Sequence, residues 1–212
     1  MLKNIVSKTF IIFLGILFSS AILYASPIIT LSDEDIVAKT NIERKFMYAI
    51  NIPEDLEDVE NVSQIIVKAE VLPDRENLEL NRAAYGFTKT KLKITKVFSG
   101  DLKVDDVIAI TEEYFYFTDS ISGELHLHAV ALYEPAVIGE EYIFFLYGKG
   151  RPNTAREGTY QIVNITDGKF PITKNNLKTQ KADILSNSEL NIGEGDISKY
   201  KKMYNEVMEK YN

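Results

Sequence analysis

The chain has 212 residues, 45% of them hydrophobic, and carries 31 acidic against 24 basic residues, a net charge of -7. This length is enough to bury one sizeable core. An acidic surface repels phosphate backbones, so nucleic acid is excluded as a partner. Because the chain has no cysteine, disulfides, thiolate zinc sites, cysteine nucleophiles and a lipidated cysteine are excluded as well.

Residues 1–26 have the form of an export signal. Two lysines precede an apolar run from Phe10 to Tyr24, and small residues follow it. Such a leader directs the rest of the chain across the membrane. Both a cleaved signal peptide and an uncleaved N-terminal membrane anchor stay open, because residues 10–31 are uncharged and long enough to span a bilayer. In either case we expect a protein that is secreted or held on the extracytoplasmic face of the cell membrane.

The next segment, residues 27–55, is predicted to form an N-terminal helical arm. Within it, LSDEDIVAKTNIERKFMYAI (31–50) begins with Ser32, which can cap a helix, followed by acidic residues that favour the positive end of a helix. Pro53 ends this pattern. The stretch PEDLEDVENVS (53–63) predicts one or two further helical turns.

From Gln64 onward the apolar residues alternate with polar ones, as in β-strands. Strands are predicted at 64–72, 87–100, 106–119 and 141–149, with a polar loop at 73–86. LHLHAVALYEP (125–135) predicts a further short strand, and 158–172 predicts a hairpin around Asp167 and Gly168. The uninterrupted apolar run EYIFFLYGK (141–149) indicates a central, buried strand. We therefore expect residues 56–172 to form a mainly β domain, a small antiparallel barrel of five to seven strands or a sandwich.

Two segments follow the predicted β domain. Residues 173–195 are polar and lack periodicity, which predicts a linker. In 196–212, Asp196 can cap an amphipathic helix with one apolar stripe, which contains Ile197, Tyr200, Met203, Tyr204, Val207, Met208 and Tyr211. This stripe either docks back on the β domain or binds a partner or a membrane.

Four segments, QIIVKAEVL, KLKITKVFSGDLKVDDVIAI, IGEEYIFFLYG and YQIV with GKFPI, occur in that order between Leu56 and Ile172. Together they resemble bacterial secreted proteins, mostly uncharacterised, whose domain is similar to the inhibitory domain of tissue inhibitors of metalloproteinases (TIMP-like). The resemblance implies an OB-like β-barrel. In the animal inhibitors a mature N-terminal cysteine chelates the protease zinc. This chain has no cysteine and would begin with SPIITLSDED, so the resemblance does not carry metalloproteinase inhibition with it.

The two histidines of the chain lie in GELHLHAV, where Glu124, His126 and His128 share one face of an extended strand. Two imidazoles and a carboxylate are ligands that zinc accepts. The alternative is that they are polar residues of an edge or loop, because a spacing of two is common to all strands. We favour the second interpretation and predict no metal and no cofactor.

In EYFYF (113–117) the side chains of Tyr114 and Tyr116 lie on one face of a strand, where they could form a stacking platform for a ligand. The favoured interpretation is that they form the wall of the core, since aromatic residues are common in strands. The sequence contains no phosphate-binding glycine loop, no G-x-S-x-G and no H-E-x-x-H motif, so we predict that the protein is not an enzyme.

The sequence thus predicts an exported, non-catalytic binding module on an OB-like barrel, with an unknown extracytoplasmic protein, peptide or cell-wall component as its ligand. Two alternatives stay open. One is a membrane-anchored accessory subunit that engages its partner through the C-terminal helix. The other is a metal-dependent protein or enzyme that uses Glu124, His126 and His128.

Overall fold

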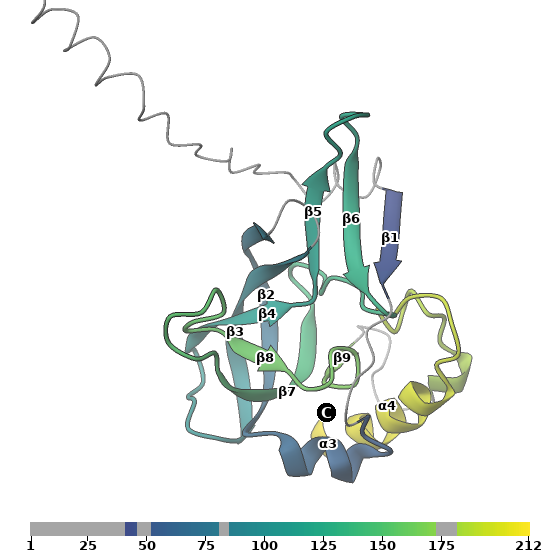
Figure 1. The fold of residues 1–212 in the computed structure, drawn as a ribbon. Coiled ribbons are helices and arrows are strands. Elements are labelled where there is room, and N and C mark those ends of the chain that lie inside the picture. Colours follow the sequence, from purple (N-terminus) through teal and green to yellow (C-terminus); the bar gives the residue numbers. More distant parts are fainter. Residues whose placement is uncertain (1–40, 46–51, 81–84, 173–181) are drawn as a thin grey trace, which may run out of the picture. The chain divides into compact units, whose positions relative to one another are not determined.

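The computed structural model describes residues 41–45, 52–80, 85–172 and 182–212, and for 41–45 it describes the backbone alone. All of these residues belong to one compact unit, and they form a mainly β fold (Figure 1). Its strands are β1 (Asn41–Lys45), β2 (Ile65–Leu80), β3 (Tyr85–Ser99), β4 (Val107–Glu112), β5 (Tyr114–Thr118), β6 (Leu125–Val130), β7 (Glu141–Lys149), β8 (Tyr160–Ile162) and β9 (Lys169–Ile172). Its helices are α3 (Leu56–Val62), the 3-10 turn η1 (Ala182–Ile184) and α4 (Ser198–Tyr211).

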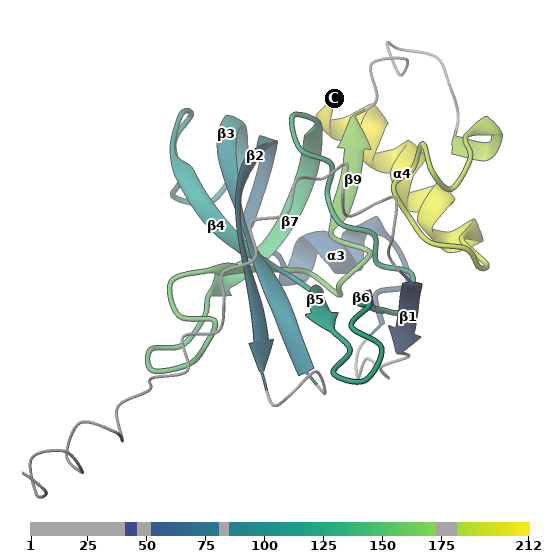
Figure 2. The same cartoon turned by 90° about the horizontal axis from the view of Figure 1, so that it is seen from above.

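Five strands of the larger sheet pair in a closed cycle. The order is β2-β3-β4-β8-β7, β7 pairs back to β2, and β9 adds to β7. The pairing of β4 with β8 is parallel, and the other pairings of this sheet are antiparallel. Because the cycle closes, each of its five strands has a neighbour on both sides. In Figure 2, β2, β3, β4 and β7 lie together, and α3 and α4 lie to one side of them.

The long strand β2 serves two neighbours because its pairing is irregular. Its first residues, 65–70, pair with β7. Its register with β3 shifts three times, the last time between Val71 and Arg75. Each irregularity bends and coils a strand, as a closed cycle of strands requires.

The predicted polar loop at 73–86 is wrong at 73–80 and 85–86, because β2 continues to Leu80 and β3 begins at Tyr85; residues 81–84 lie outside the described residues. The polar side chains of this stretch form ion pairs across the two strands. Lys89 lies 3.2 Å from Glu76, and Lys91 pairs with Asp74. A run of charged residues therefore forms the solvent face of a hairpin here.

Strand β7 separates two hydrophobic clusters, which confirms that it is a central buried strand. Tyr142, Phe144 and Leu146 contribute to the first cluster, which lies inside the cycle of strands. Ile143 and Phe145 point the other way, into a second cluster shared with α3, α4 and β9. Alternate residues of one strand face opposite sides of a sheet, so an uninterrupted apolar run fits this position.

The C-terminal helix docks on the β fold, as one of the two interpretations predicted. The buried residues of α4 belong to the predicted stripe: Tyr200, Met203, Tyr204, Val207 and Tyr211. The predicted cap at Asp196 needs correction, because Ile197 occupies the N-cap position and no side chain makes a capping hydrogen bond there. Asp196, one residue earlier, accepts hydrogen bonds from the backbone and side chain of Ser198. The predicted linker needs correction where it is described, because Ala182, Leu185, Leu190 and Ile192 are buried in the second cluster. Apolar residues scattered among polar ones gave no periodic signal in the sequence.

The predicted N-terminal helical arm is wrong at residues 41–45, which form strand β1 and pair in parallel with β6. The other residues of the predicted helix, 31–40 and 46–50, lie outside the described residues. The predicted short helix is confirmed as α3, with Asp55 capping it through the backbone N–H of Asp58. The predicted leader, 1–26, also lies outside the described residues.

Two strand predictions need refinement. Segment 106–119 divides at Glu113 into β4, which belongs to the cycle, and β5, which pairs with β6 in the smaller sheet β1-β6-β5. Segment 158–172 contains β8 and β9, but these do not pair with each other, so the predicted hairpin is wrong. Both strands pair with β7 instead.

Candidate functional site

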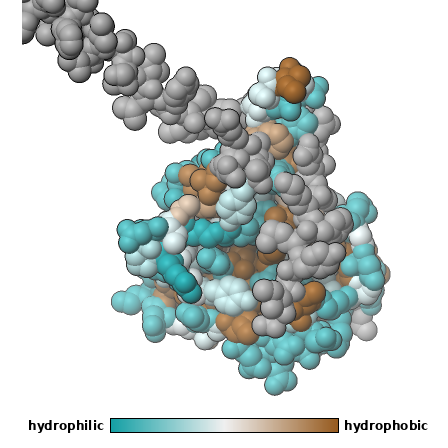
Figure 3. Space-filling view, in the orientation of Figure 1, coloured by the Kyte–Doolittle hydropathy of each residue, from teal (hydrophilic) through white to brown (hydrophobic). Residues whose placement is uncertain are grey.

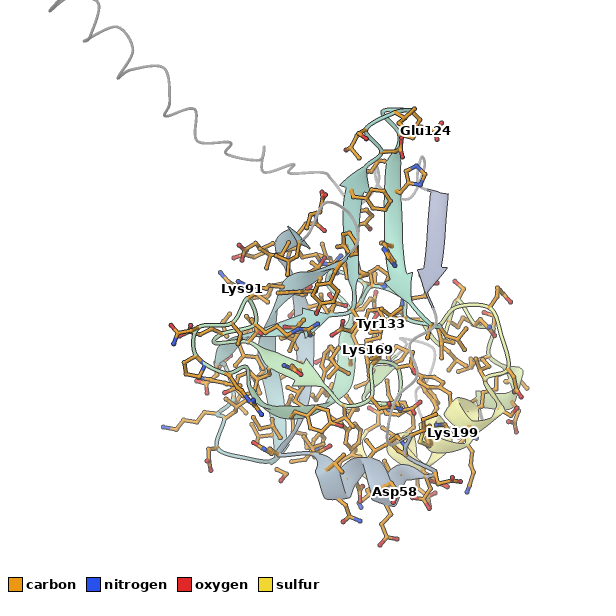
Figure 4. The ribbon with its side chains drawn as sticks, viewed as in Figure 1. Asp58, Lys91, Glu124, Tyr133, Lys169 and Lys199 are labelled. Atoms are coloured by element: carbon orange, nitrogen blue, oxygen red, sulfur yellow. The ribbon has the colours of Figure 1, made fainter. Side chains whose placement is uncertain are left out.

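The residues considered as metal ligands lie on the β5–β6 hairpin. Glu124 Oε2 is 3.9 Å from His126 Nε2. The Glu124 side chain is 62% exposed and marks the end of the hairpin in Figure 4, whereas His128 is only 5% exposed. In the part of the chain that the structure describes, no three His, Asp or Glu residues are grouped so that they could hold a metal ion.

Both imidazoles instead pack against phenylalanine rings of β5. The ring of His126 stacks on Phe117 at 5.2 Å between centroids, and the ring of His128 lies 4.9 Å from Phe115. These pairs sit directly opposite each other in the β5–β6 register. Phe115 and Phe117 thus share the face of the histidines. The sequence could have indicated this, because the two hairpin strands carry His and Phe at the same two-residue spacing.

The hairpin ends in a turn that is held by hydrogen bonds. Asp119 Oδ1 accepts from the backbone N–H groups of Ile121 and Ser122, at 2.8 and 2.7 Å. These bonds lower the pKa of the Asp119 carboxyl, because they stabilise its charged form. Hydrophobic surface is visible at the end of the hairpin in Figure 3, where Ile121 is 96% exposed.

The two tyrosines considered as a ligand platform differ in their surroundings. Tyr114 is buried in the first core cluster and stacks on Tyr133, whereas Tyr116 is partly buried at the edge of that cluster. Burial raises the pKa of the Tyr114 hydroxyl well above its ordinary value, and the charge of Glu112 adds to this effect. Tyr114 therefore forms part of the core wall, where it presents no face to solvent.

A buried polar cluster centred on Glu112 lies beside these tyrosines. One carboxylate oxygen of Glu112 accepts from the Tyr133 hydroxyl at 2.6 Å and from the Ala136 N–H at 2.8 Å, and the other accepts from Thr90. A buried carboxylate is tolerated when its oxygens are hydrogen-bonded in this way. Glu112 thereby fastens the segment between β6 and β7 to β3 and β4.

Lys169, the first residue of β9, extends the cluster (Figure 4). Its ammonium donates to the Glu134 carbonyl and, at 2.6 Å, to Asn191 Oδ1, and it lies 4.5 Å from the centre of the Tyr133 ring. Burial lowers the pKa of Lys169 to about 8, against the negative charge of Glu112, which raises it. The side chain is thus a costly buried cation held by partners from two separate segments, the one between β6 and β7 and the one that contains Asn191.

This cluster is closed to ligands. The cavity next to Lys169, lined by residues that include Thr166, Asn191 and Tyr200, is too small to admit a water molecule. A catalytic lysine needs room for a reacting group. We conclude that Glu112 and Lys169 hold the fold together. The sequence offered one signal for both residues, a charged residue inside or beside a strongly apolar strand.

A second ordered cluster positions an exposed loop, residues 150–159, between β7 and β8. Arg156 forms a two-pronged ion pair with Glu113 and donates to the Tyr85 hydroxyl at 2.6 Å. Its guanidinium also lies 4.8 Å from the centre of the Phe87 ring. Burial lowers the pKa of Arg156, but the hydrogen bonds and charge of Glu113 outweigh it and raise the pKa overall. Arg156 therefore fastens the loop to β3 and to the junction of β4 and β5.

The remainder of this loop is exposed but internally bonded. Residues 151–155 and 157 are exposed. The Asn153 N–H donates to Glu157 Oε2 at 2.8 Å, and the Thr154 hydroxyl donates to the Arg151 carbonyl at 2.7 Å. These hydrogen bonds restrict the conformations that the loop can adopt.

An open groove of about 760 Å³ lies between α3 and α4. Its lining is mostly acidic and includes Glu57, Glu60, Glu206 and Glu209. Lys210 and the Tyr211 hydroxyl both contact Glu60, at 2.7 and 2.6 Å. These contacts tie the two helices together across the groove.

No family model, curated protein or solved structure matches the chain. In the described part of the chain, no helix is both long and apolar enough to cross a membrane.

Proposed function

We propose that the protein is an exported, non-catalytic binding module whose domain, residues 56–172, is an OB-like barrel. Two features support the barrel: the closed cycle β2-β3-β4-β8-β7, and the parallel pairing of β4 with β8 within an otherwise antiparallel sheet. The likeness to TIMP-like secreted proteins, noted from the sequence, is part of this proposal. Export rests on the leader.

The observation that carries the binding function is the fastened loop 150–159. OB-folds bind ligands through the loop between their first two strands and the loop between their last two. In this chain, the loop between β7 and β8 corresponds to the latter. Arg156 joins it to Tyr85, at the start of β3 and next to the former. We infer that this loop contacts an extracytoplasmic protein, peptide or wall component.

The test is affinity capture from envelope proteins and cell-wall fragments with three versions of the chain. One is unchanged, one carries Arg151→Glu at the exposed loop, and one carries Lys202→Glu on α4 as a matched charge reversal at a side chain that is 68% exposed. We expect the same ligand on the unchanged chain and on the α4 control, and its loss with Arg151→Glu. A reproducible blank, or equal capture by all three versions, would count against the loop as the binding surface.

A further inference from the structure

Strand β1 completes the smaller sheet from a distant part of the chain. Residues 41–45 pair in parallel with 126–130 of β6, with Glu43 opposite His128 and Arg44 opposite Ala129. Among the described strands, β6 is the one to which β1 pairs. The other partner of β6 is β5, its neighbour in the local hairpin. The edge of β6 is therefore satisfied by a segment that lies about eighty residues away in sequence.

Side chains cover the sheet edges at β5 and β9 at several positions. On β5, the Asn77 side chain accepts from the Tyr116 N–H at 2.7 Å and donates to its carbonyl at 2.8 Å. On β9, the Tyr200 and Tyr204 hydroxyls donate to the carbonyls of Lys169 and Pro171, at 2.8 and 2.9 Å. Such contacts block the addition of a further strand. By contrast, the side of β6 that faces away from β5 pairs with the backbone of strand β1.

Without β1, the edge of β6 would be open to strand addition. Main-chain hydrogen bonds supply the affinity in this mode of recognition, and alternate side chains supply the specificity. On β6, Leu127 and Ala129 face the first core cluster, while His126 and His128 pack on the phenylalanines of the opposite face. Parallel pairing is slightly weaker per residue than antiparallel pairing, which favours exchange of a strand of only five residues.

We propose that the edge of β6 is a strand-acceptor site, and that it binds residues 41–45 of a second copy of this chain in place of the chain's own segment. The two copies then exchange identical strands, which is a low-cost route to a dimer. The occupant is fixed by the contact already formed within one chain, because the second copy offers the same five residues in the same register. This inference concerns a different surface from loop 150–159 and stands independently of the proposed function.

The absence of cysteine from the chain allows a direct test by disulfide trapping. Neighbouring strands lie about 4.8 Å apart, within the range of Cα separations that a disulfide bridges. Full-length chains carrying Arg44→Cys are mixed with full-length chains carrying Ala129→Cys, in mild detergent and a glutathione redox buffer. The matched control mixes Arg44→Cys with Asp183→Cys, which places the second thiol at an exposed position on η1. A single chain carrying both Arg44→Cys and Ala129→Cys reports the pairing within one copy.

We expect the double variant to form an internal disulfide, and the mixture of single variants to form a disulfide-linked heterodimer that the control mixture lacks. Because the chain's own segment competes at an effective concentration on the order of millimolar, about a tenth of the chains should be cross-linked at about 100 µM protein. An internal disulfide without any heterodimer above the control overturns the exchange. The absence of an internal disulfide overturns the pairing itself. Glu43→Cys with His128→Cys repeats the test at the adjacent register position, so a fault of one variant cannot decide it.

Discussion

The buried Lys169 provides the sharpest prediction, because its pKa of about 8 in the folded protein lies well below the ordinary 10.5. Below pH 8 the side chain is charged in both the folded and unfolded states, and its burial lowers the free energy of unfolding. As the pH rises from 8 towards 10.5, the folded state releases the proton first, so stability increases with pH. A shift of this size corresponds to about 3 kcal/mol of free energy of unfolding, most of which should be gained between pH 7 and pH 10.

The assay is urea unfolding of the wild type and Lys169→Met at several pH values between 7 and 10. The variant loses the hydrogen bonds to Glu134 and Asn191 at every pH, so this loss changes its free energy of unfolding by the same amount at every pH. Only the titration of Lys169 makes the difference between the two proteins change with pH. Lys202→Met, at an exposed position of α4, is the matched control and should leave the pH dependence unchanged. Parallel wild-type and Lys169→Met curves would refute the reasoning, since they would mean that the buried amine keeps its ordinary pKa.

Three further predictions concern packing and the fastening of the loop. Arg156→Lys loses the two-pronged ion pair with Glu113 and should lower the free energy of unfolding, measured by urea titration, by about 1–2 kcal/mol. As a control, Lys91→Met removes a more exposed ion pair and should change the free energy of unfolding by less than about 0.5 kcal/mol. Met203→Ala empties a fully buried position of α4 and should cost about 2–4 kcal/mol by thermal unfolding; a loss below about 1 kcal/mol would mean that the helix is not firmly docked. Gly86→Ala places a methyl group 2.5 Å from the Phe115 ring and should lower the free energy of unfolding by about 1–3 kcal/mol. The near-UV circular dichroism of the aromatic residues should change as well. An unchanged stability and spectrum would contradict this close packing.

Above pH 10 the tyrosines oppose the effect of Lys169. Burial raises the pKa of Tyr114, Tyr133 and Tyr142 in the folded protein above the ordinary value of 10. Their unfolded forms ionise first, so stability is lost as the pH rises above 10. The wild type should therefore be most stable near pH 10, and Lys169→Met should lack the rise on the neutral side of that maximum.

The sequence located several elements and part of the candidate site. The apolar run at 141–149 identified β7, because a strand buried on both faces needs no polar alternation. The buried stripe of α4 was also predicted correctly, because a helix that buries one face repeats its apolar residues every three to four positions in the sequence. The sequence also placed Glu124, His126 and His128 on one face of a strand. It did not show how exposed each side chain is, or that both imidazoles pack on phenylalanine rings, because these features depend on the partner strand β5.

Local pattern determined most of the strands and the helices α3 and α4 in this protein, and only the tertiary structure decided the remaining strands and how the elements combine. Residues 73–80 read as a loop because charged residues are rare in strands, yet ion pairs with β3 stabilise them in a hairpin. Residues 41–45 read as helix because their propensity is ambiguous, and pairing with β6 determines their conformation. The roles of Glu112, Lys169 and Arg156 depend on partners 21 to 71 residues away, from Glu112 with Tyr133 to Arg156 with Tyr85. Contacts at such separations leave no period in the sequence, so the fastened loop and the buried cluster emerge only from the fold.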